Sequence, residues 1–372
     1  MDADVVIIGG GIAGLSLAAR LAPSLSVVLL EAEAAFAHHA SGRSAALYEP
    51  RYGSPAVVEL SLASGDFFRA AKGVLSPRGL LMVGRAADAD AFRADSASMG
   101  LSPITVAEAC AMVPILNPDS VALAAHSPDA WDIDTDLLLQ DFVRTARAAG
   151  ARLHTHAAVT DIRRAGGLWH LTTAAGPVSA RLLVNAAGAW VDQIARLAGT
   201  QPLGFTPYRR SMARLPAPGA QDVSRWPMLF GAGESWYAKP DAGALIVSPA
   251  EEHATEPHDA WADDMILAEG LARFEQMVTE PVTRLLSNWA GLRTFAPDRT
   301  LVIGHDPQEP AFFWLAGQGG QGFQSCPAAS QLAADLILGQ SPALSAALVA
   351  AVSPARFGGR APVLRAAAHF DG

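Results

Sequence analysis

The sequence predicts a two-domain α/β protein in which one domain is assembled from separated segments of the chain. The 372 residues are 51% hydrophobic and 17% charged, which is enough for two buried cores. A buried strand, a glycine-rich turn and a helix follow one another within residues 5–22, and similar units recur at 182–198 and 312–338. Residues 204–288 differ, because short strand-like runs there are separated by Gly and Pro, as in an antiparallel sheet.

The first unit has the pattern of a Rossmann-like dinucleotide-binding turn. The apolar run at residues 5–8 suits a strand buried on both faces, and the sequence G-x-G-x-x-G follows at Gly9, Gly11 and Gly14. The helix after it would direct its N–H groups at a pyrophosphate. Glu31 ends the second strand, where a carboxylate can accept the ribose hydroxyls and disfavours a 2′-phosphate. This unit makes NADP an unfavourable ligand and leaves FAD and NAD open.

Two further loops are expected near a dinucleotide. Residues 38–46 form a polar, small-residue loop with one arginine, suited to the far end of a dinucleotide or to a flavin ring. Residues 319–325 join a buried strand to a helix, for which Ser325 is the expected N-cap and Pro327 a first-turn residue. The positive end of that helix could stabilise negative charge on a cofactor.

The remaining elements follow from hydrophobic periodicity and capping residues. Asp132 to Asp136 resembles the start of a calcium loop, but Leu137 and Val143 stand where its glycine and closing glutamate should be. We therefore expect Asp134 or Thr135 to cap a helix. The expected helices are 56–72, 86–99, 137–149, 191–198, 264–279 and a last one ending at 338, and the expected strands include 79–83, 151–156, 159–162, 182–186 and 312–316.

Composition excludes several classes of function. A net charge of −9, from 36 acidic and 27 basic residues, offers no basic surface for nucleic acid. The two cysteines form no metal-ligand pattern and suit a reducing compartment. The adjacent His38 and His39 point in different directions and lack a third ligand, so no metal site is expected. Because the first strand begins almost at the first residue, we expect no signal peptide or transmembrane anchor and a cytoplasmic location.

The expected domains alternate along the chain. Residues 1–78, 140–203 and 289–372 are assigned to the discontinuous Rossmann-like domain, and residues 79–139 and 204–288 to an antiparallel-sheet, substrate-binding domain.

Several separated motifs, occurring in the same order, resemble the flavin-dependent family of D-amino-acid oxidase, glycine oxidase and sarcosine oxidase. Within this family the sequence is most similar to the bacterial D-arginine dehydrogenases. The resemblance covers nearly the whole chain and implies non-covalently bound FAD. The motifs are Ser41–Ala46, Asp132–Asp136, Val184–Trp190, Trp226–Leu229, Tyr237 to Gly243, Trp289–Arg293 and Gln318–Gly320.

The resemblance also implies a set of site residues. Arg210, Tyr237 and Arg293 match positions that hold the α-carboxylate of the substrate, Tyr52 a lid or wall tyrosine, and Gly320 a backbone carbonyl near the amine. A planar guanidinium can bind a carboxylate by two parallel hydrogen bonds. The residues expected at the cofactor are Gly9, Gly11, Ile12, Ala13, Gly14, Glu31, Ser41, Gly42, Arg43, Ser44, Ala45, Ala46, Val159, Ala187, Gly188, Trp190, Gly319, Gly320, Gln321 and Gly322.

Two departures from the arginine-specific enzymes bear on the substrate. Leu81, or Leu80 if a one-residue gap is placed differently, stands where those enzymes have a glutamate that binds the basic side chain, and Leu47 stands where they have a histidine. Because an unpaired buried charge is costly, D-Arg and D-Lys are expected to be poor substrates and neutral or apolar D-amino acids preferred.

The implied reaction is hydride transfer from Cα to FAD, giving an imino acid that hydrolyses to a 2-oxo acid and ammonia. No base for the amine is evident, and solvent or Tyr52 could serve. Oxidation of a secondary amine or a 2-hydroxy acid, and a non-catalytic flavin-binding role, remain alternatives. The expected partners are an amino-acid substrate and an electron acceptor such as oxygen or a quinone, for a monomer or small homo-oligomer.

Overall fold

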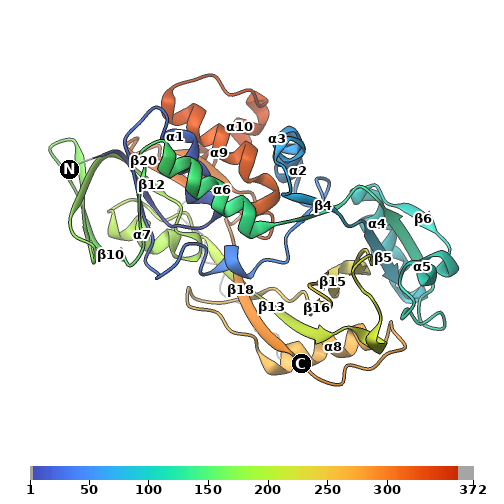
Figure 1. Ribbon diagram of the computed structural model, residues 1–372. Coiled ribbons are helices and arrows are strands. Elements are labelled where there is room, and N and C mark those ends of the chain that lie inside the picture. The colour runs from blue at the N-terminus through green and yellow to red at the C-terminus, as the bar shows by residue number, and fades with distance from the viewer. Residues whose placement is uncertain (1–2, 359–372) are drawn as a thin grey trace.

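The computed structural model describes residues 3–358 and shows two lobes built on two large sheets (Figure 1). The first sheet has eight strands, and β1 (Ala3–Ile8) lies at its centre, parallel to β2 (Val27–Leu30) and β12 (Val178–Asn185). The neighbours β9 (Arg152–His154) and β20 (Phe312–Ala316) continue the parallel part. The strands β2 and β20 are buried along their whole length, as is β1 except at Asp4, because both faces of the sheet are covered there, whereas β9 lies at the exposed edge.

Antiparallel strands extend this sheet at its edges. One half of β12 pairs with β20 and the other half with β11 (Leu168–Thr173), which in turn pairs with β10 (Val159–Ala165). The strand β19 (Val302–His305) pairs with β20 on the other side. Segments from both ends of the chain are thus hydrogen-bonded into one sheet, as the sequence predicted.

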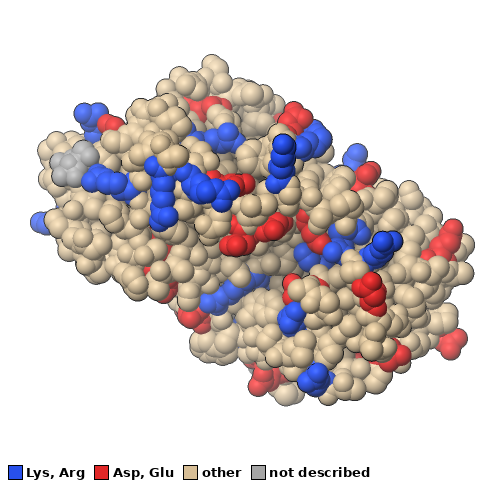
Figure 2. Space-filling model, viewed as in Figure 1, with Lys and Arg blue, Asp and Glu red and all other residues tan. Residues whose placement is uncertain are grey.

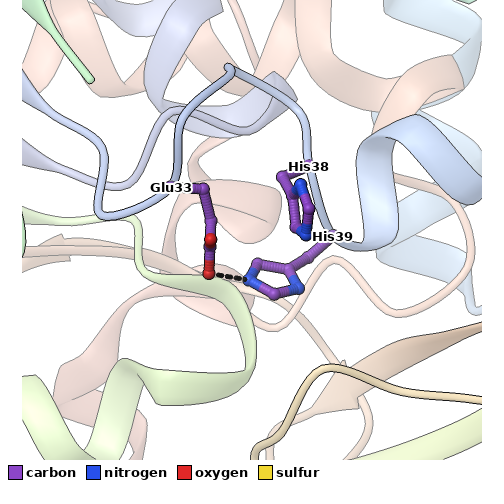
Figure 3. A group of neighbouring side chains, drawn as sticks. All are labelled: Glu33, His38 and His39. Carbon is purple, nitrogen blue, oxygen red and sulfur yellow. Dashed lines mark hydrogen bonds and ion pairs between the residues drawn. The ribbon is translucent and has the colours of Figure 1, made fainter. Parts of the chain in front are cut away.

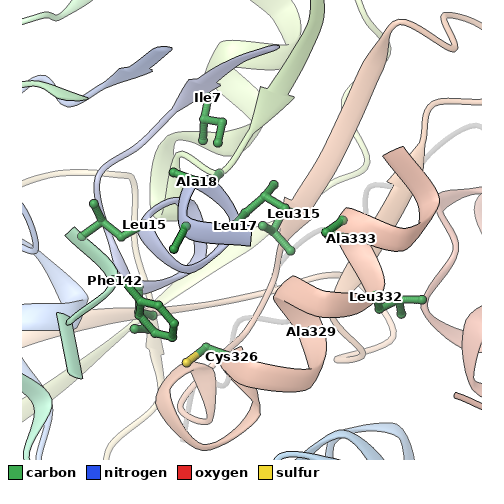
Figure 4. Packing of buried hydrophobic residues seen from close by; sticks show 14 of the residues in the cluster. Ile7, Leu15, Leu17, Ala18, Phe142, Leu315, Cys326, Ala329, Leu332 and Ala333 are labelled. Atoms are coloured by element: carbon green, nitrogen blue, oxygen red, sulfur yellow. The ribbon is translucent and has the colours of Figure 1, made fainter. Parts of the chain in front are cut away.

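Helices α1 (Ile12–Leu21), α6 (Thr135–Ala148) and α9 (Gly322–Leu338) cover one face of this sheet. Their side chains interdigitate with those of β1 and β20, where Leu15, Leu17 and Leu315 are almost completely buried (Figure 4). Burial of each such leucine contributes roughly 1.5–3 kcal/mol relative to exposure. On the opposite face Trp169 and Trp314 form a separate core with α7 (Val191–Leu197). The shorter helices around α9 are α2 (Pro55–Ala63), α3 (Gly65–Ala70) and α10 (Ala346–Val352).

The second sheet has nine strands and is antiparallel except where β14 (Met228–Gly231) runs parallel to β5 (Leu80–Gly84). Its long strands β13 (Thr206–Pro216) and β18 (Ser287–Phe295) pair over nine residues and run from one lobe into the other (Figure 1). The other strands are β6 (Ser102–Ile104), β7 (Leu123–Ser127), β15 (Tyr237–Asp241), β16 (Ala244–Ser248) and β17 (His253–Ala254).

The two faces of the second sheet are both apolar. One packs against α5 (Val106–Met112) and α8 (Asp264–Glu275), and the other includes residues of α4 (Ala89–Met99) and turns toward the first lobe. A small third sheet of β3 (Leu47–Tyr48), β4 (Leu75–Pro77) and β8 (Trp131–Ile133) joins the lobes. There Asp132 forms ion pairs with Arg78 at 2.5 Å and with Lys239 at 2.9 Å.

The structure corrects the expected domain boundaries at two places. Residues 289–295 were assigned to the Rossmann-like domain, but they alternate inward and outward as β18 and are hydrogen-bonded to β13 in the second sheet. Residues 135–139 were assigned to the substrate domain, but they begin α6, which packs against α1. The predicted cap is confirmed, because the carboxylate of Asp134 accepts the N–H of Leu137 at 2.8 Å.

The start of α9 also differs from the prediction. The helix begins at Gly322, so Pro327 lies inside it, and the hydroxyl of Ser325 donates to the carbonyl of Gln321 at 2.8 Å instead of capping. The helix is thus longer at its N-terminus by the four residues Gly322 to Ser325, because the glycine-rich sequence before Ser325 favours a loop up to that residue. The helix terminus therefore lies closer to Gly320 than expected.

Acidic and basic side chains both occupy the face shown in Figure 2. Within residues 3–358, no helix combines the length and the apolar character needed to cross a membrane.

Candidate active site

Three adjoining cavities run from the carboxyl ends of β1 and β2 into the space between the lobes. The first has a volume of about 540 Å³ and is lined by the Gly9–Gly11 turn, Glu31 and Trp190. A second, of about 130 Å³, shares Gly11 with the first and reaches Arg293. A third, of about 260 Å³, also contains Arg293. We call them the dinucleotide, inner and outer cavities. A long ligand could occupy the first two and place one end beside Arg293.

The glycine turn is closed by contacts that leave no room for side chains. A Cβ on Gly9, whose φ is 112°, would lie 2.3 Å from the carbonyl oxygen of Ala186. A Cβ on Gly14 would lie 2.0 Å from the carbonyl oxygen of Gly9. The N–H of Ile12 donates to the hydroxyl of Ser41 at 3.0 Å, while the next first-turn N–H groups have no acceptor within the helix. This end of α1 is therefore suited to bind an anionic group at the junction of the two cavities.

Glu31 is fixed by the backbone beside the dinucleotide cavity. Its Oε2 accepts the N–H of Gly10 at 2.7 Å, and its Oε1 accepts the N–H of Glu33 at 2.9 Å. The residue is 8% exposed, and each carboxylate oxygen has a second lone pair for a ligand. The expected contact with a ribose stays a prediction.

Most residues expected at the cofactor line the first two cavities. Gly14, Gly42 and Ala46 line none of the three cavities, and Gln321 lines the outer one. Residues lining the dinucleotide cavity are Gly9, Gly11, Glu31, Ser41, Arg43, Val159, Ala187, Gly188 and Trp190. Those lining the inner cavity are Gly11, Ile12, Ala13, Ser41, Arg43, Ser44, Ala45, Gly188, Gly319, Gly320 and Gly322.

Arg43 has a structural task in addition to its place in the cavities. Its Nη1 donates to the carbonyl oxygens of Ala260 at 2.8 Å and Ala290 at 3.0 Å, and its Nη2 pairs with Asp259. Its own carbonyl oxygen accepts the indole N–H of Trp289 at 3.1 Å. The guanidinium therefore ties the loop of the first lobe to the second lobe.

Sequence reasoning missed a cluster of Glu33, His38 and His39 at the wall of the dinucleotide cavity (Figure 3). His39 Nε2 lies 2.9 Å from Glu33 Oε1, and its ring centroid lies 4.5 Å from that of Trp190. These histidines have a third possible ligand nearby after all, because the chain folds back after β2 and places Glu33 beside them. The other ring nitrogen of His39, Nδ1, is buried and has no hydrogen-bond partner within residues 3–358.

The structure brings Arg210 and Arg293 together on one face of paired strands. In the register of β13 and β18, Tyr208 faces Arg293 and Arg210 faces Gly291, so the two arginines are diagonal neighbours. Gly291 leaves space beside the Arg210 side chain, which is 3% exposed. Both guanidinium groups line the inner cavity.

The two guanidinium groups are poorly neutralised by the protein. Burial lowers the pKa of Arg210, and the positive charge of Arg293 lowers it further. Arg210 Nη2 is 3.4 Å from Glu252, and its Nε has no hydrogen-bond partner in the described chain. Within residues 3–358 no hydrogen bond or ion pair to Arg293 is found. Two adjacent cations with unused donors form a site for an anion, most simply a carboxylate.

Gly320 and Tyr237 adjoin this pair in different ways. A Cβ on Gly320 would lie 2.8 Å from Arg293 Cζ, so only glycine allows the guanidinium its observed position. Tyr237 is 3% exposed, and its hydroxyl lies 3.3 Å from Met212 Sδ, a weak acceptor. It lines none of the three cavities, although its charge interactions reach both arginines.

Tyr52 lines the outer cavity with Arg293. Its segment is held by Gln324, whose Nε2 donates to the carbonyl of Tyr52 at 3.1 Å and whose Oε1 accepts the N–H of Glu49 at 3.1 Å. Burial raises the pKa of the Tyr52 phenol; the charge of Arg293 opposes this, and Glu234 raises the pKa further. Tyr52 therefore keeps its proton at neutral pH and is not by itself the base for an amine.

The cluster that contains Tyr237 is apolar, and its composition distinguishes the two leucines that the sequence left open. Leu81 points into the core under α5 and α8, away from the site. Because strand side chains alternate, its neighbours Leu80 and Met82 face the cluster that contains Tyr237. Leu47, the other departure, packs against the same cluster.

Comparisons with known proteins agree with this geometry. Residues 4–336 match the DAO family model, described as FAD dependent oxidoreductase. Glycine oxidase from Pseudomonas putida is 26% identical over 363 residues, covering 93% of this chain and 98% of that protein. Mitochondrial dimethylglycine dehydrogenase from Homo sapiens is 24% identical over 379 residues, covering 91% of this chain and 43% of that protein.

Solved structures have the same fold. Glycine oxidase from Geobacillus kaustophilus gives a TM-score of 0.78 at 23% identity, covering 95% of this chain and 98% of that one. L-α-glycerophosphate oxidase from Mycoplasma pneumoniae, solved with FAD bound, gives 0.79 at 18% identity, covering 91% and 95%. The cofactor is FAD, and the glycine turn, Glu31 and the adjoining cavities fit it. The chain belongs to the DAO family of FAD-dependent oxidoreductases.

Proposed function

We propose that the protein oxidises a neutral or apolar D-amino acid to its imino acid, which water hydrolyses to a 2-oxo acid and ammonia. The observation that carries this proposal is the pair of neighbouring arginines that line the inner cavity, the buried Arg210 with an unpartnered Nε and the half-buried Arg293 with no direct partner in the described chain. When bound, FAD supplies the acceptor for the hydride that leaves Cα. The α-amino group and Cα of the substrate would lie within a few bonds of the carboxylate that these arginines hold.

The arginines would orient the substrate as well as bind it. Two guanidinium groups on neighbouring strands restrict rotation of a carboxylate more than one does. Gly320 allows Arg293 to sit beside the start of α9, so the clamp and the cofactor cavity share one wall. A substrate held in this orientation needs no further search for the reactive geometry, and this can lower the activation free energy of the reaction by several kcal/mol.

The cofactor would be held mainly by groups of the first lobe. The N-terminus of α1 would face the phosphates, and Glu31 would accept hydroxyls of the adenosine ribose. We add His39 to this set, because its buried Nδ1 has an unused hydrogen-bonding position at the cavity wall. The ring is kept in place by Glu33 and Trp190.

The apolar wall supports a neutral side chain on the substrate. Leu47, Leu80 and Met82 belong to or pack against the cluster that contains Tyr237, and none of them offers a partner to a cationic side chain directed toward this cluster. They line none of the three cavities, and the outer cavity, on another side of the clamp, has the carboxylate of Glu234. Burying an unpaired guanidinium or ammonium there would cost several kcal/mol. D-Arg and D-Lys should therefore be turned over poorly. The preference for the D-enantiomer rests on the resemblance of the sequence motifs to enzymes of D-amino acids.

A second candidate is oxidation of an N-substituted amino acid. It is favoured by the names of similar proteins, which include dimethylglycine dehydrogenase and, by structure, iminodiacetate oxidase from Chelativorans at a TM-score of 0.79 and 22% identity. The same arginines would hold the carboxylate of such a substrate. A 2-hydroxy acid could be held in the same way.

Anaerobic mixing of the FAD-loaded protein with a substrate panel separates these functions. The panel holds neutral D-amino acids, their L-enantiomers, D-Arg and D-Lys, N-methyl amino acids and 2-hydroxy acids. Loss of flavin absorbance with neutral D-amino acids alone supports the proposal, and bleaching by N-methyl compounds alone supports the second candidate. Failure of every amine and hydroxy acid would indicate a non-catalytic flavin protein. Turnover with oxygen, compared with an artificial acceptor, then identifies the acceptor class.

A further inference from the structure

The outer cavity contains a carboxylate that the proposed clamp does not use. Glu234 ends the short 3-10 helix η5 (Ala232–Glu234) and lines this cavity together with Tyr52 and Arg293. The other two carboxylates of the cavity are occupied: Asp95 accepts the N–H of Gly233 at 2.7 Å, and Glu252 pairs with Arg299 at 2.9 Å. Glu234 instead has no hydrogen bond or ion pair within residues 3–358, and it lines the same cavity as Tyr52, whose pKa its charge helps to raise.

Oxidation of an amino acid requires a proton acceptor near the amine. An ammonium group has no lone pair to assist departure of the hydride from Cα, so it must first lose a proton. Tyr52 is beside the clamp, but its half-buried phenol cannot hold a negative charge easily, because desolvation raises its pKa. A phenol that both accepts and donates a hydrogen bond can pass a proton on without being ionised for long.

We propose that Tyr52 and Glu234 form a proton relay from the substrate amine to the water of the outer cavity. The ammonium proton passes to Tyr52 Oη as the hydroxyl proton of Tyr52 passes to a carboxylate oxygen of Glu234. The resulting carboxylic acid returns that proton to water, so each group regains its starting state and the amine is left neutral. This relay rests on the proposed amino-acid oxidation.

Other charges that face Tyr52 and Glu234 come from several elements. Arg210 on β13 and Arg293 on β18 favour negative charge at the phenol, and they therefore ease the transfer. Tyr237 adjoins both arginines, and Glu252 and Arg299 neutralise each other at the cavity wall. Asp95 on α4 and Arg51 complete the ionisable lining of the cavity. Among these acids, Glu234 is the one whose carboxylate has no partner in the described chain and is free to accept a proton from the phenol.

The test is the rate of anaerobic flavin reduction by a neutral D-amino acid, measured in the FAD-loaded protein between pH 6 and 10. For Glu234→Gln we expect a loss of about 10–100-fold at neutral pH, in line with loss of one proton-transfer group. The difference in reduction rate between the variant and the wild type should decrease toward pH 10, where the substrate binds with its amine already deprotonated. Tyr52→Phe should give the same profile, the double variant no further loss, and Glu234→Asp partial recovery.

Asp95→Asn is the matched control, because it removes the same charge from the same cavity while its amide oxygen can still accept the N–H of Gly233 and keep η5 in place. Its pH profile should follow the wild type. An unchanged profile for Glu234→Gln, or a loss equal at every pH, would overturn the relay. A loss confined to cationic substrates would also overturn it and would identify Glu234 as a side-chain recognition group. Failure of the wild type to be reduced by any amino acid would instead overturn the proposed function.

Discussion

Substitution of Arg293 by methionine separates its role in binding from any role in folding. Methionine keeps an apolar stem of similar length and removes the guanidinium. Hydrogen bonds to charged groups contribute roughly 1.5–3 kcal/mol each, so loss of two removes roughly 3–6 kcal/mol. Because about 1.4 kcal/mol is a factor of ten, kcat/KM should fall by about 10²–10⁴-fold.

The same substitution should not destabilise the protein without substrate. Removing one partner of a buried ion pair usually costs about 3–5 kcal/mol because the other charge is stranded. Arg293 has no direct hydrogen bond or ion pair within residues 3–358 to be broken. Burial opposes its charge, whereas the nearby carboxylates of Glu234 and Glu252 favour it and help to raise its pKa. The unfolding temperature of Arg293→Met should therefore stay within a few degrees of the wild type, roughly the effect of a change below 1 kcal/mol.

Arg209→Met is the matched control for this experiment. Arg209 is the neighbour of Arg210 on β13, and its side chain pairs with Asp263 at 3.5 Å instead of lining the inner cavity. It should keep wild-type kcat/KM. The measurements are steady-state kinetics, FAD content by absorbance and thermal unfolding. A kcat/KM for Arg293→Met within threefold of the wild type would refute the clamp.

Four other experiments, with five substitutions, probe separate parts of the protein. Gly320→Ala places a methyl group 2.8 Å from Arg293 Cζ, so kcat/KM should fall about 10–100-fold while FAD content stays constant; unchanged kinetics would contradict the tight contact. Leu80→Glu should raise the D-Lys to D-Val activity ratio, whereas Leu81→Glu should lower the unfolding temperature sharply; the reverse would show that the faces of β5 are misassigned. Glu31→Gln should weaken FAD binding about 10–100-fold in calorimetry of the apoprotein, and an unchanged Kd would argue against a ribose contact. Burial raises the pKa of Glu49 to about 7 from an ordinary 4.5, so the folded protein binds this proton more tightly and its stability falls as pH rises between these values. At pH 8 the free energy of unfolding of Glu49→Gln should accordingly exceed that of the wild type by up to about 3 kcal/mol, whereas at pH 4.5 the two proteins should be equally stable. An equal gain at the two pH values would show that the stabilisation comes from packing and not from the charge of Glu49.

Local sequence patterns were sufficient to predict the main elements of the first lobe. The strand, glycines, helix and acid at residues 4–31 are close in sequence, and each is constrained by the chemistry of its neighbours. The strand before the second glycine-containing turn and the cap at Asp134 were predicted for the same reason. Arg210 and Arg293 came from resemblance to a family, because no local pattern indicates that β13 and β18 pair in the register that brings them together.

The features that were missed depend on contacts between distant segments. Glu33 approaches His39 because the chain turns after β2, and Gln324 reaches Glu49 and Tyr52 across most of the sequence. A one-residue uncertainty at Leu80 and Leu81 reversed the face of the strand, as the two-residue period of a strand requires. Single residues with ordinary local surroundings carry no signal of such contacts.

Comparison of D-valine with D-valinamide tests the central claim most directly. The two compounds share the amine, the Cα–H bond and the side chain, but the amide lacks the negative charge that Arg210 and Arg293 would bind. Flavin reduction is followed anaerobically over a range of concentrations for each compound. The account predicts saturable reduction by D-valine and at least about 100-fold lower kcat/KM for D-valinamide. Equal reduction by both compounds, or no reduction by D-valine and other neutral D-amino acids, would contradict it.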